Sequence, residues 1–395
     1  MKTVFSRYLI LGGGAAGFRA AGEIRARDRA GTIRILSREN GLPCKRPLLS
    51  KAALRQLRTD QLQLHDTGWP ERMDITLTGG TEIRALCPED KTVLTDDGIF
   101  RYEKCIYALG GSNFVPPFPG VEKQGVFTVR TENDVREIKK AALCAQVAVV
   151  IGGGVVGLET ALVLKAYGLR VTVLEALPRL MPRLLDEDTS RRVGSILPGI
   201  DIFTGVTVSA LVGEDRVEAV ELADGRRFPC GLAVISCGQR ANLSPAQSAG
   251  IACGRGVTVN EKMETSAKDV WACGDCAEWN GVNAALWTQA LAEGRVAGAN
   301  AAGGDERLKV LDTSLILHGE GGSLFALGDL GCDPQKEYVV QTRETALRRF
   351  SIHDREVWAV EKRVFSQGRP VGACILGNLT NMEAMRREIL GEAGK

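Results

Sequence analysis

Two glycine-rich stretches are the parts of this sequence whose residue types and spacing could do chemistry. Residues 12–17 read Gly-Gly-Gly-Ala-Ala-Gly and residues 152–157 read Gly-Gly-Gly-Val-Val-Gly, each directly after an apolar run of strand length. In the G-x-G-x-x-G pattern the first glycine allows a tight turn, the second lets a pyrophosphate approach the backbone, and the third lets a helix pack closely on the strand. The phosphates would then meet the free N–H groups at the helix N-terminus.

A single G-x-G-x-x-G stretch is weak evidence, because an ordinary strand–helix turn can have the same sequence. Two copies in the same context argue against that interpretation and predict two dinucleotide-binding sites. The residues expected to line the two turns are Gly12, Gly14, Ala15, Ala16, Gly17, Gly152, Gly154, Val155, Val156 and Gly157.

An acidic residue at the end of the second strand would indicate which dinucleotide binds, because its carboxylate accepts hydrogen bonds from the adenosine ribose. In the second copy, Glu175 ends the strand-like segment 170–175. Its charge would repel the 2′-phosphate of NADPH, so the sequence favours NADH. Arg179 follows four residues later and keeps NADPH from being excluded.

The first copy is less regular at the corresponding place. Ser37 stands where a strict repeat would have the acid, and Glu39 follows two residues later. Glu39 is therefore the predicted ribose ligand, and Arg38 is a candidate for contact with the phosphates.

The repeat extends beyond the glycines. Residues 91–111 and 215–238 both read as a strand, an Asp-Gly turn, a second strand and an apolar strand that ends in glycine. Each half of the chain would then be a βαβ unit with a small hairpin insertion and a closing strand. This pattern predicts an α/β protein with two Rossmann-like dinucleotide-binding domains.

Composition limits the possible classes of protein. The 395 residues are 44% hydrophobic and 25% charged, carry a net charge of +2, and include eleven cysteines and three histidines. No apolar run approaches the roughly 18 residues of a membrane span, and the dispersed basic residues indicate no nucleic-acid surface. The cysteines are odd in number and scattered along the chain, which favours a reducing compartment, so a cytoplasmic protein without a signal peptide is expected. The one C-x-x-C, at 273–276, lacks a second pair, so no metal site is predicted.

Five stretches together resemble the FAD- and NAD-dependent pyridine nucleotide oxidoreductases. They are the two glycine turns, PCKRPLLSK at 43–51, YALGGSNFVPPFPG at 107–120 and DVWACGDCAEW at 269–279. Within that family the chain most resembles the NADH:rubredoxin and ferredoxin reductases and the flavoprotein portions related to assimilatory nitrite reductase. The resemblance covers nearly the whole chain and implies a glutathione-reductase-like fold with a small C-terminal α+β domain.

The resemblance also implies roles for single residues. Asp275 would bind the flavin ribityl chain, and Arg46 would bind the FAD phosphates or the ribityl chain. Lys51 matches the family's lysine beside the flavin ring and Glu159 matches the glutamate paired with it, which makes these two the predicted catalytic residues. Each would keep the other ionised. Further cofactor-binding residues implied by the resemblance are Ala108, Gly110, Gly238, Gly274 and Trp287.

The sequence departs from the family pattern most notably at Cys44. This cysteine stands where the family usually has an aromatic residue, and Lys45 and Arg46 follow it. The main hypothesis is an FAD-dependent NADH:acceptor oxidoreductase that passes electrons to a small carrier such as rubredoxin or ferredoxin, as a monomer or homodimer. A thiol, disulfide or peroxide reductase or an NADH oxidase that uses Cys44 is the alternative enzyme. A flavin-dependent redox-sensing interaction protein is the non-enzymatic alternative.

The repeat also predicts domain boundaries. Residues 1–112 and 243–305 would form an FAD-binding domain, with an NAD(H)-binding domain, residues 113–242, inserted between them. From 306 to 395 the pattern changes to alternating strand-like segments followed by the helix-like segment 381–390, which predicts the small α+β domain.

Overall fold

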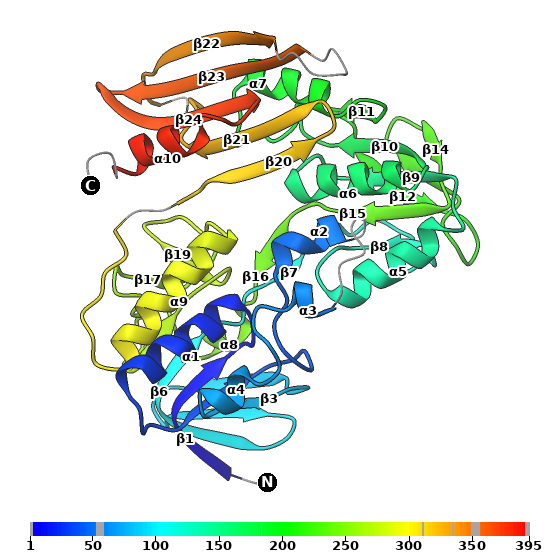
Figure 1. Cartoon of the computed structure of the whole chain (residues 1–395). Helices are drawn as coiled ribbons and strands as arrows, with labels where there is room; N and C mark the ends of the chain where they lie inside the picture. Colours follow the sequence, from blue (N-terminus) through cyan, green and yellow to red (C-terminus); the bar gives the residue numbers. More distant parts are fainter. Residues whose placement is uncertain are drawn as a thin grey trace. The chain divides into compact units, whose positions relative to one another are not determined.

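The computed structural model describes residues 3–52, 59–182, 184–309, 312–333, 335–348 and 356–391 (Figure 1). The chain divides into two compact units. Unit 1 consists of Met1–Leu48, Leu57–Ser112 and Gln239–Leu311, and unit 2 of Leu49–Gln56, Asn113–Gly238 and Asp312–Lys395. The domain boundaries that the repeat predicts, at residues 112, 242 and 305, stay predictions.

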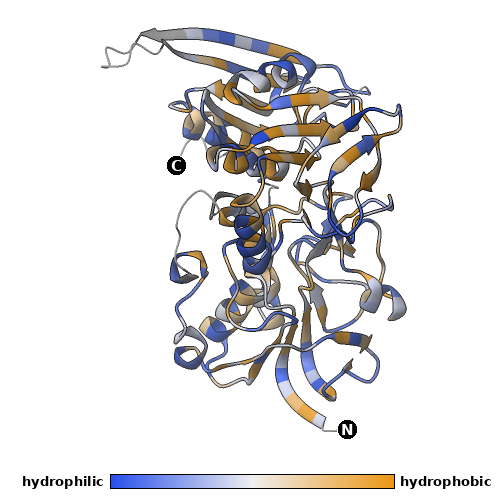
Figure 2. Ribbon diagram, turned by 90° about the vertical axis from the view of Figure 1, so that its right-hand side faces the viewer, coloured by the Kyte–Doolittle hydropathy of each residue, from blue (hydrophilic) through white to orange (hydrophobic). Residues whose placement is uncertain are grey.

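Unit 1 is built on a mostly parallel sheet. Its strands are β1 (Thr3–Leu11), β2 (Ile33–Leu36), β3 (Ile75–Thr78), β4 (Ile83–Cys87), β5 (Thr92–Thr95), β6 (Ile99–Tyr107) and β18 (Val270–Ala272). The strand order is β3-β2-β1-β6-β5-β4, and β18 also pairs with β6 in parallel. Leu9, Ile10 and Leu11 of β1 are fully buried, as expected for a parallel strand covered on both faces. Figure 2 shows hydrophobic residues along many of the strands and hydrophilic residues on many of the connecting loops.

Helices α1 (Ala15–Arg27) and α9 (Trp287–Ala301) pack against each other and join distant parts of unit 1 (Figure 1). The contact is close because α9 has glycine where it meets α1. A Cβ at Gly294 would lie 2.4 Å from the carbonyl oxygen of Ala16, and one at Gly298 would lie 2.4 Å from that of Ala20. A larger residue at either position would force the helices apart.

Several short elements complete this part of the chain. They are the 3-10 helix η1 (Arg46–Leu48), α3 (Thr59–Leu62), α4 (Trp69–Arg72), α8 (Ser244–Ser248), β7 (Gly111–Asn113), β16 (Gln239–Ala241), β17 (Val257–Val259) and β19 (Ala277–Trp279).

Unit 2 contains a second parallel sheet, with the order β11-β10-β9-β15-β8. Its strands are β8 (Val126–Phe127), β9 (Val147–Ile151), β10 (Arg170–Glu175), β11 (Asp201–Thr204) and β15 (Leu232–Ile235). Buried side chains of α5 (Glu132–Ala142) and α6 (Val155–Ala166) share a core with this sheet. A small antiparallel sheet, β12 (Val208–Val212), β13 (Ala219–Leu222) and β14 (Arg227–Pro229), and the short helix α2 (Leu49–Ala52) also belong to unit 2.

The two copies of the predicted hairpin insertion differ in one respect. In unit 2, β13, β14 and β15 are three separate strands, as the repeat predicts. In unit 1 the second hairpin strand and the closing strand are one continuous strand, β6, which differs from the prediction. Pro229 and Gly231 interrupt the chain before β15, because proline cannot donate to a ladder and glycine weakens a strand, whereas β6 contains neither residue.

The C-terminal part of unit 2 is an antiparallel sheet with one helix, which confirms the predicted α+β character. Its strands, in the order β20-β21-β24-β23-β22, are β20 (Leu315–Gly319), β21 (Gly322–Gly328), β22 (Val339–Arg348), β23 (Glu356–Ser366) and β24 (Arg369–Gly377). The helix is α10 (Met382–Leu390), whose Met385 is fully buried against the sheet.

A buried lysine ties this antiparallel sheet to the helix α7 of unit 2. Lys362 of β23 is 5% exposed, and its Nζ lies 2.8 Å from Oδ1 of Asp186 and 2.9 Å from Oδ2 of Asp188. Asp186 is the N-cap of α7 (Glu187–Arg192), which is followed by the 3-10 helix η2 (Val193–Ile196). One ammonium group therefore bridges two carboxylates at the start of a helix, and Asp188 has a second cationic partner in Arg192, at 3.0 Å. No helix in the described part of the chain is long and apolar enough to cross a membrane.

Candidate functional site

The first glycine turn joins β1 to α1 in unit 1. Gly12 has a φ of +117°, and a Cβ there would lie 2.1 Å from the carbonyl oxygen of Ala108, so the turn requires glycine. A Cβ at Gly17 would lie 2.2 Å from the carbonyl oxygen of Gly12. The first and third glycines of the motif are therefore needed by the fold itself.

Gly14 is different, because the fold does not need a glycine there. Its φ is −86°, and no described atom would lie within 4 Å of an added Cβ. Among the described glycines, only Gly14, Gly154 and Gly194 combine such open space with a φ outside the left-handed region. The free space at Gly14 adjoins the N-terminus of α1, where a pyrophosphate could approach the backbone.

The second glycine turn, between β9 and α6 in unit 2, reproduces these features. Gly152 has a φ of +115°, and its Cβ would lie 2.2 Å from the carbonyl oxygen of Ser236. A Cβ at Gly157 would lie 2.1 Å from the carbonyl oxygen of Gly152, while Gly154 again faces open space, with a φ of −81°. Val155 and Val156 form the first turn of α6, as Ala15 and Ala16 form that of α1.

Glu175 lies at the end of β10 and beside this turn. Its Oε2 accepts a hydrogen bond of 2.6 Å from the backbone N–H of Gly153, and its Oε1 accepts one of 2.8 Å from that of Leu177. These two bonds fix the carboxylate at the glycine turn. The structure thus brings together the motif and the acid that the sequence predicts for the ribose.

In unit 1 the place that corresponds to Glu175 is taken by Ser37. A Cβ at Gly13 would lie 2.6 Å from Oγ of Ser37, which is buried. Glu39 is partly exposed instead, and its Oε1 lies 2.7 Å from Nη2 of Arg46. The two residues predicted to bind FAD from separate segments, Glu39 and Arg46, are therefore ion-paired with each other, and Arg38 is exposed.

The segment Gly274–Asp275 follows β18 and lies beside the first turn of α1. Gly274 has a φ of +82°, and a Cβ there would lie 2.8 Å from Cβ of Ala16. The amide of Asn283 donates to the carbonyl oxygens of Asp275 at 2.9 Å and Ala277 at 2.7 Å, which holds this loop. The structure therefore places Asp275 next to the predicted phosphate site, while Trp287 begins α9 in the same unit.

Asn242 fixes the segment after β6, a role that the sequence does not announce. Its side-chain amide donates to the carbonyl oxygen of Leu109 at 2.8 Å, and its backbone N–H donates to that of Gly110 at 2.9 Å. Ala108, which precedes them, is 6% exposed. Gly238, in unit 2, has a φ of +95° and accepts a hydrogen bond from the N–H of Phe114.

Glu293 of α9 is a second residue that sequence reasoning missed. It is 4% exposed, and its Oε2 accepts a hydrogen bond of 2.7 Å from the N–H of Gly274. Its Oε1 accepts one of 2.9 Å from Nε2 of Gln289. Burial raises the pKa of Glu293 to about 7, although the two hydrogen bonds oppose the rise. Two polar residues four apart on the buried face of a helix were the signal that could have found this pair.

The predicted catalytic pair is only partly described. Glu159 of α6 is 7% exposed, and the hydroxyl of Ser50 donates a hydrogen bond to its Oε2. Lys51 lies on α2, but its side chain is outside the described residues. Ser50, the neighbour of Lys51 in the sequence, is thus a further residue of this site.

The cysteines differ in their surroundings. Cys44 is half-buried, whereas Cys273 and Cys276 are completely buried. Burial raises the pKa of the Cys276 thiol to about 12 and that of Cys273 well above its usual value. Both members of the C-x-x-C are therefore protonated thiols at neutral pH. Among the described residues, no group of three or more His, Cys, Asp and Glu residues could hold a metal ion.

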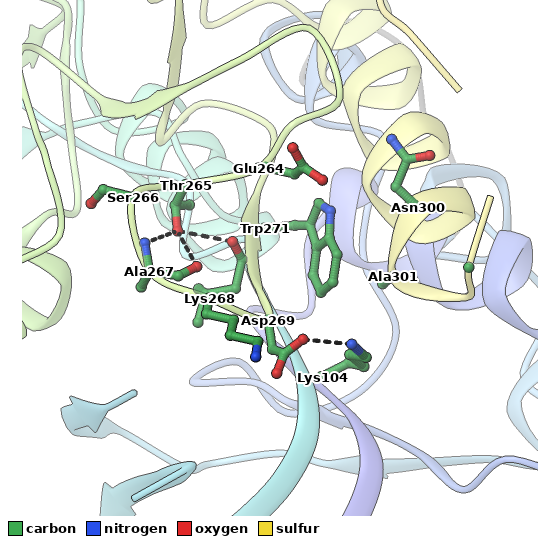
Figure 3. Close-up of a pocket in the computed structure, with 12 residues that line it drawn as sticks. Lys104, Glu264, Thr265, Ser266, Ala267, Lys268, Asp269, Trp271, Asn300 and Ala301 are labelled. Carbon is green, nitrogen blue, oxygen red and sulfur yellow. Dashed lines mark hydrogen bonds and ion pairs between the residues drawn. The ribbon is translucent and has the colours of Figure 1, made fainter. Parts of the chain in front are cut away.

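Figure 3 shows a surface pocket of unit 1, with a volume of about 510 Å³, that lies away from the glycine turn. Its lining includes Lys104 of β6 and Asp269, which precedes β18, whereas Gly274 follows the carboxyl end of that strand. Cofactors of open α/β sheets bind at the carboxyl ends of the strands. Asp269 accepts hydrogen bonds from Lys104 at 2.5 Å and from Lys91 at 2.6 Å. Burial alone would raise the pKa of Asp269, but these bonds lower it, so the charges of this pocket neutralise each other.

Comparison with known proteins decides the family. A family model described as pyridine nucleotide-disulphide oxidoreductase matches residues 6–294. The chain belongs to this family. The membership confirms the predicted resemblance and the glutathione-reductase-like fold with two Rossmann-like domains. This oxidoreductase depends on NAD(P)H and flavin, and members of its family typically bind FAD and NAD(P)H.

Three relatives illustrate the range of this oxidoreductase family. The ferredoxin reductase component of chlorobenzene dioxygenase from Cupriavidus sp. (strain PS12) is 34% identical over 277 residues, which are 68% of this chain and 67% of that protein. An NADH oxidase from Methanocaldococcus jannaschii is 32% identical over 398 residues, covering 94% of this chain and 87% of that one. The crystal structure of NADH:rubredoxin oxidoreductase from Clostridium acetobutylicum has a TM-score of 0.77 at 25% identity, and covers 98% of this chain and 95% of that one.

Proposed function

We propose that this oxidoreductase passes electrons from NADH through FAD to a small electron-carrier protein such as rubredoxin or ferredoxin. The observation that carries the proposal is the pair Gly14 and Gly154, the glycines of the two turns that neither backbone strain nor packing requires. Each leaves open space at a helix N-terminus, where free N–H groups and the helix dipole stabilise a pyrophosphate. One such place in each unit supports two dinucleotides rather than one.

Unit 1 is the proposed FAD-binding unit. Its glycine turn would hold the pyrophosphate, and Asp275, beside Ala16, would bind the ribityl chain. Arg46 would contact the phosphates, and its ion pair with Glu39 orients the guanidinium group. When bound, the flavin accepts a hydride and gives up its electrons one at a time. The protein's part is to hold the cofactor through backbone N–H groups and a few fixed side chains.

Unit 2 is the proposed NADH-binding unit. The carboxylate of Glu175 is fixed beside the turn by the N–H groups of Gly153 and Leu177. It can therefore accept hydrogen bonds from ribose hydroxyls without reorganising. The same negative charge would lie close to a 2′-phosphate, so repulsion supports NADH rather than NADPH as the preferred donor.

Lys51 and Glu159 are the proposed residues that tune the flavin. A buried carboxylate such as Glu159 favours a cationic partner, and Lys51 follows Ser50, which already donates to that carboxylate. A lysine held in its charged form near the flavin would stabilise the negative charge that develops on reduction.

The test is to reduce the purified protein with NADH without oxygen and then follow reoxidation of the flavin by separate acceptors. Rubredoxin and ferredoxin should reoxidise it rapidly, whereas disulfides should not. A protein that contains no flavin after purification, or reduced flavin that only oxygen reoxidises, would contradict the proposal.

A second candidate is an NADH oxidase, because the M. jannaschii relative of that name matches nearly the full length of this chain. The position of Cys44, half-buried and followed by two basic residues that favour a thiolate, supports this candidate. Oxygen would then be the preferred acceptor in the same reoxidation experiment, and the carrier proteins would add nothing to the rate.

A further inference from the structure

Helix α9 carries a buried carboxyl group that the proposed binding of FAD and NADH does not by itself require. Glu293 is 4% exposed, and its two oxygens have one hydrogen-bond donor each, the N–H of Gly274 and the amide of Gln289. Neither donor is a cation. A carboxylate in such a place loses its hydration without gaining an opposite charge, so its ionised form is costly.

The described groups that influence Glu293 include no cation. From the loop after β18 they are the carboxylate of Asp275 and the protonated thiols of Cys273 and Cys276. From α1, the backbone of Ala16 packs against Gly294, the residue after Glu293. Burial is the main cause of the rise in the pKa of Glu293 to about 7, and Asp275 adds to it.

A group with this pKa is divided between its two charge states near neutral pH, so a new charge nearby will change its protonation. Gln289 can serve both states. Its Nε2 donates to the ionised carboxylate, while its Oε1 is buried and has no hydrogen-bond partner in the described part of the chain. Rotation of the amide would turn that oxygen towards a protonated carboxyl, which can donate.

We propose that Glu293 is a positioning residue that takes up one proton when the bound flavin is reduced and releases it when the flavin is reoxidised. The inference rests on the proposed FAD site. Glu293 accepts a hydrogen bond from Gly274, and the next residue, Asp275, is the proposed ligand of the flavin ribityl chain. The reduced flavin is more negative, and that charge disfavours a second buried negative charge on Glu293.

The electrons and protons of this cycle balance. NADH gives the flavin a hydride, which is two electrons and one proton, and leaves as NAD⁺, while the Glu293 carboxylate takes one proton from water. Two acceptor proteins then take one electron each. The flavin loses its proton, Glu293 loses the proton that it gained, and the net reaction releases one proton for each NADH oxidised.

The test is the midpoint potential of the bound FAD, measured against pH for the wild type and for Glu293→Gln. Glu278→Gln is the matched control, because Glu278 is a partly exposed glutamate of the same unit that also accepts a glycine N–H, from Gly256 at 2.8 Å. In a window that begins near pH 7, the wild-type potential should fall more steeply than that of Glu293→Gln. The difference should approach 29.6 mV per pH unit, the value for one proton per two electrons. Glu278→Gln should keep the wild-type slope.

A second measurement does not depend on the flavin. Infrared titration of the flavin-free full chain should show a protonated carboxyl band that disappears as the pH rises through about 7 and is missing from Glu293→Gln. Gln289→Met removes the donor that stabilises the ionised form, so it should move this titration to higher pH.

The outcomes separate the inference from the function on which it rests. If the protein neither holds FAD nor is reduced by NADH, the proposed function is wrong. If it holds FAD and is reduced, but Glu293→Gln keeps the full wild-type slope, the proton-uptake role of Glu293 is overturned and the function stands. If Glu293→Gln loses FAD, the infrared titration of the flavin-free chain decides instead. A carboxyl band that neither Glu293→Gln nor Gln289→Met changes also overturns the proton-uptake role of Glu293.

Discussion

Substituting Gly154 by valine should weaken NADH binding strongly while leaving the protein folded. The φ of Gly154 is −81°, and no described atom beyond its own chain neighbours would lie within 4 Å of an added Cβ, so the fold leaves room for a side chain at this position. The cost to folding is limited to the N-cap of α6, where glycine is preferred to valine by about 1 kcal/mol. Gly152→Val should be far more damaging, because its Cβ would lie 2.2 Å from the carbonyl oxygen of Ser236 at a φ of +115°. Strain and overpacking there amount to about 2–6 kcal/mol.

The loss of affinity follows from the contacts that valine would prevent. A pyrophosphate at this turn would accept at least two charge-assisted hydrogen bonds from backbone N–H groups, each contributing about 1.5–3 kcal/mol. Their loss amounts to about 3–6 kcal/mol, or about a 10²- to 10⁴-fold rise in Kd for NADH. The matching change in unit 1, Gly14→Val, should release FAD instead.

The assay combines anaerobic reduction of the flavin at increasing NADH concentration with thermal melting. Gly194→Val is the control for the fold, because Gly194 is the third glycine with open space and an ordinary φ and lies in unit 2 on η2, outside the glycine turn. Gly154→Val should keep its flavin and melt close to Gly194→Val, yet stay oxidised at NADH concentrations that reduce the control. Normal reduction of Gly154→Val would refute the assignment of the second turn to NADH.

Three further predictions concern single side chains. Glu175→Ala should narrow the preference for NADH over NADPH by about tenfold or more, because a hydrogen bond to a charged group contributes about 1.5–3 kcal/mol; unchanged kinetics with both nucleotides would remove Glu175 from the site. Lys362→Met should lower the free energy of unfolding at neutral pH by about 1–3 kcal/mol, because it removes the ammonium group bound to the partly buried carboxylate of Asp186, whereas Asp188 keeps its ion pair with Arg192. Burial alone would raise the pKa of Asp186, but the hydrogen bonds from Lys362 and from the cap of α7 outweigh it and lower this pKa. The wild type should therefore be more stable than Lys362→Met above about pH 4, and the difference in stability should disappear as the pH falls further. Thermal melting at a series of pH values would measure this difference. Cys44→Ser should keep NADH-dependent reduction of a one-electron carrier. A long-wavelength charge-transfer band in the wild type that Cys44→Ser lacks, together with loss of turnover in that variant, would favour the thiol-based alternatives.

The glycine turns could be predicted from the sequence because their requirements are local. A positive φ at Gly12, a close approach at Gly17 and open space at Gly14 are all properties of a few adjacent residues. The acid at the end of β10 lies 22 residues beyond Gly153, but it could be predicted because one βαβ unit brings the end of its second strand back beside its glycine turn. The ribose ligand of the first copy was harder to predict, because both Ser37 and Glu39 could occupy the position that corresponds to Glu175. Only the structure shows that Ser37 lies at the turn.

Contacts between distant segments could not be predicted. The hydrogen bond from Gly274 to Glu293 depends on how α9 packs on α1. Gly294 and Gly298 stand four apart and so share one face of α9, but the sequence does not say which helix that face meets. The ion pairs of Lys362 with Asp186 and Asp188 join segments that have no common periodicity. A lysine within an apolar strand can be recognised from the sequence as unusual. Its partners cannot, because they depend on how one layer packs on another.

The contact of α9 with α1 has a consequence for how the protein is made. During synthesis α1 leaves the ribosome early, but the helix that covers it and the strand β18 that pairs with β6 emerge only after the whole of 113–238. That intervening segment is continuous, so it has its complete parallel sheet first. Until then the N-terminal sheet lacks β18, and the face of α1 that α9 covers stays exposed. Exposed surface of this kind makes a nascent chain prone to aggregation, so we expect this sheet to need protection by chaperones.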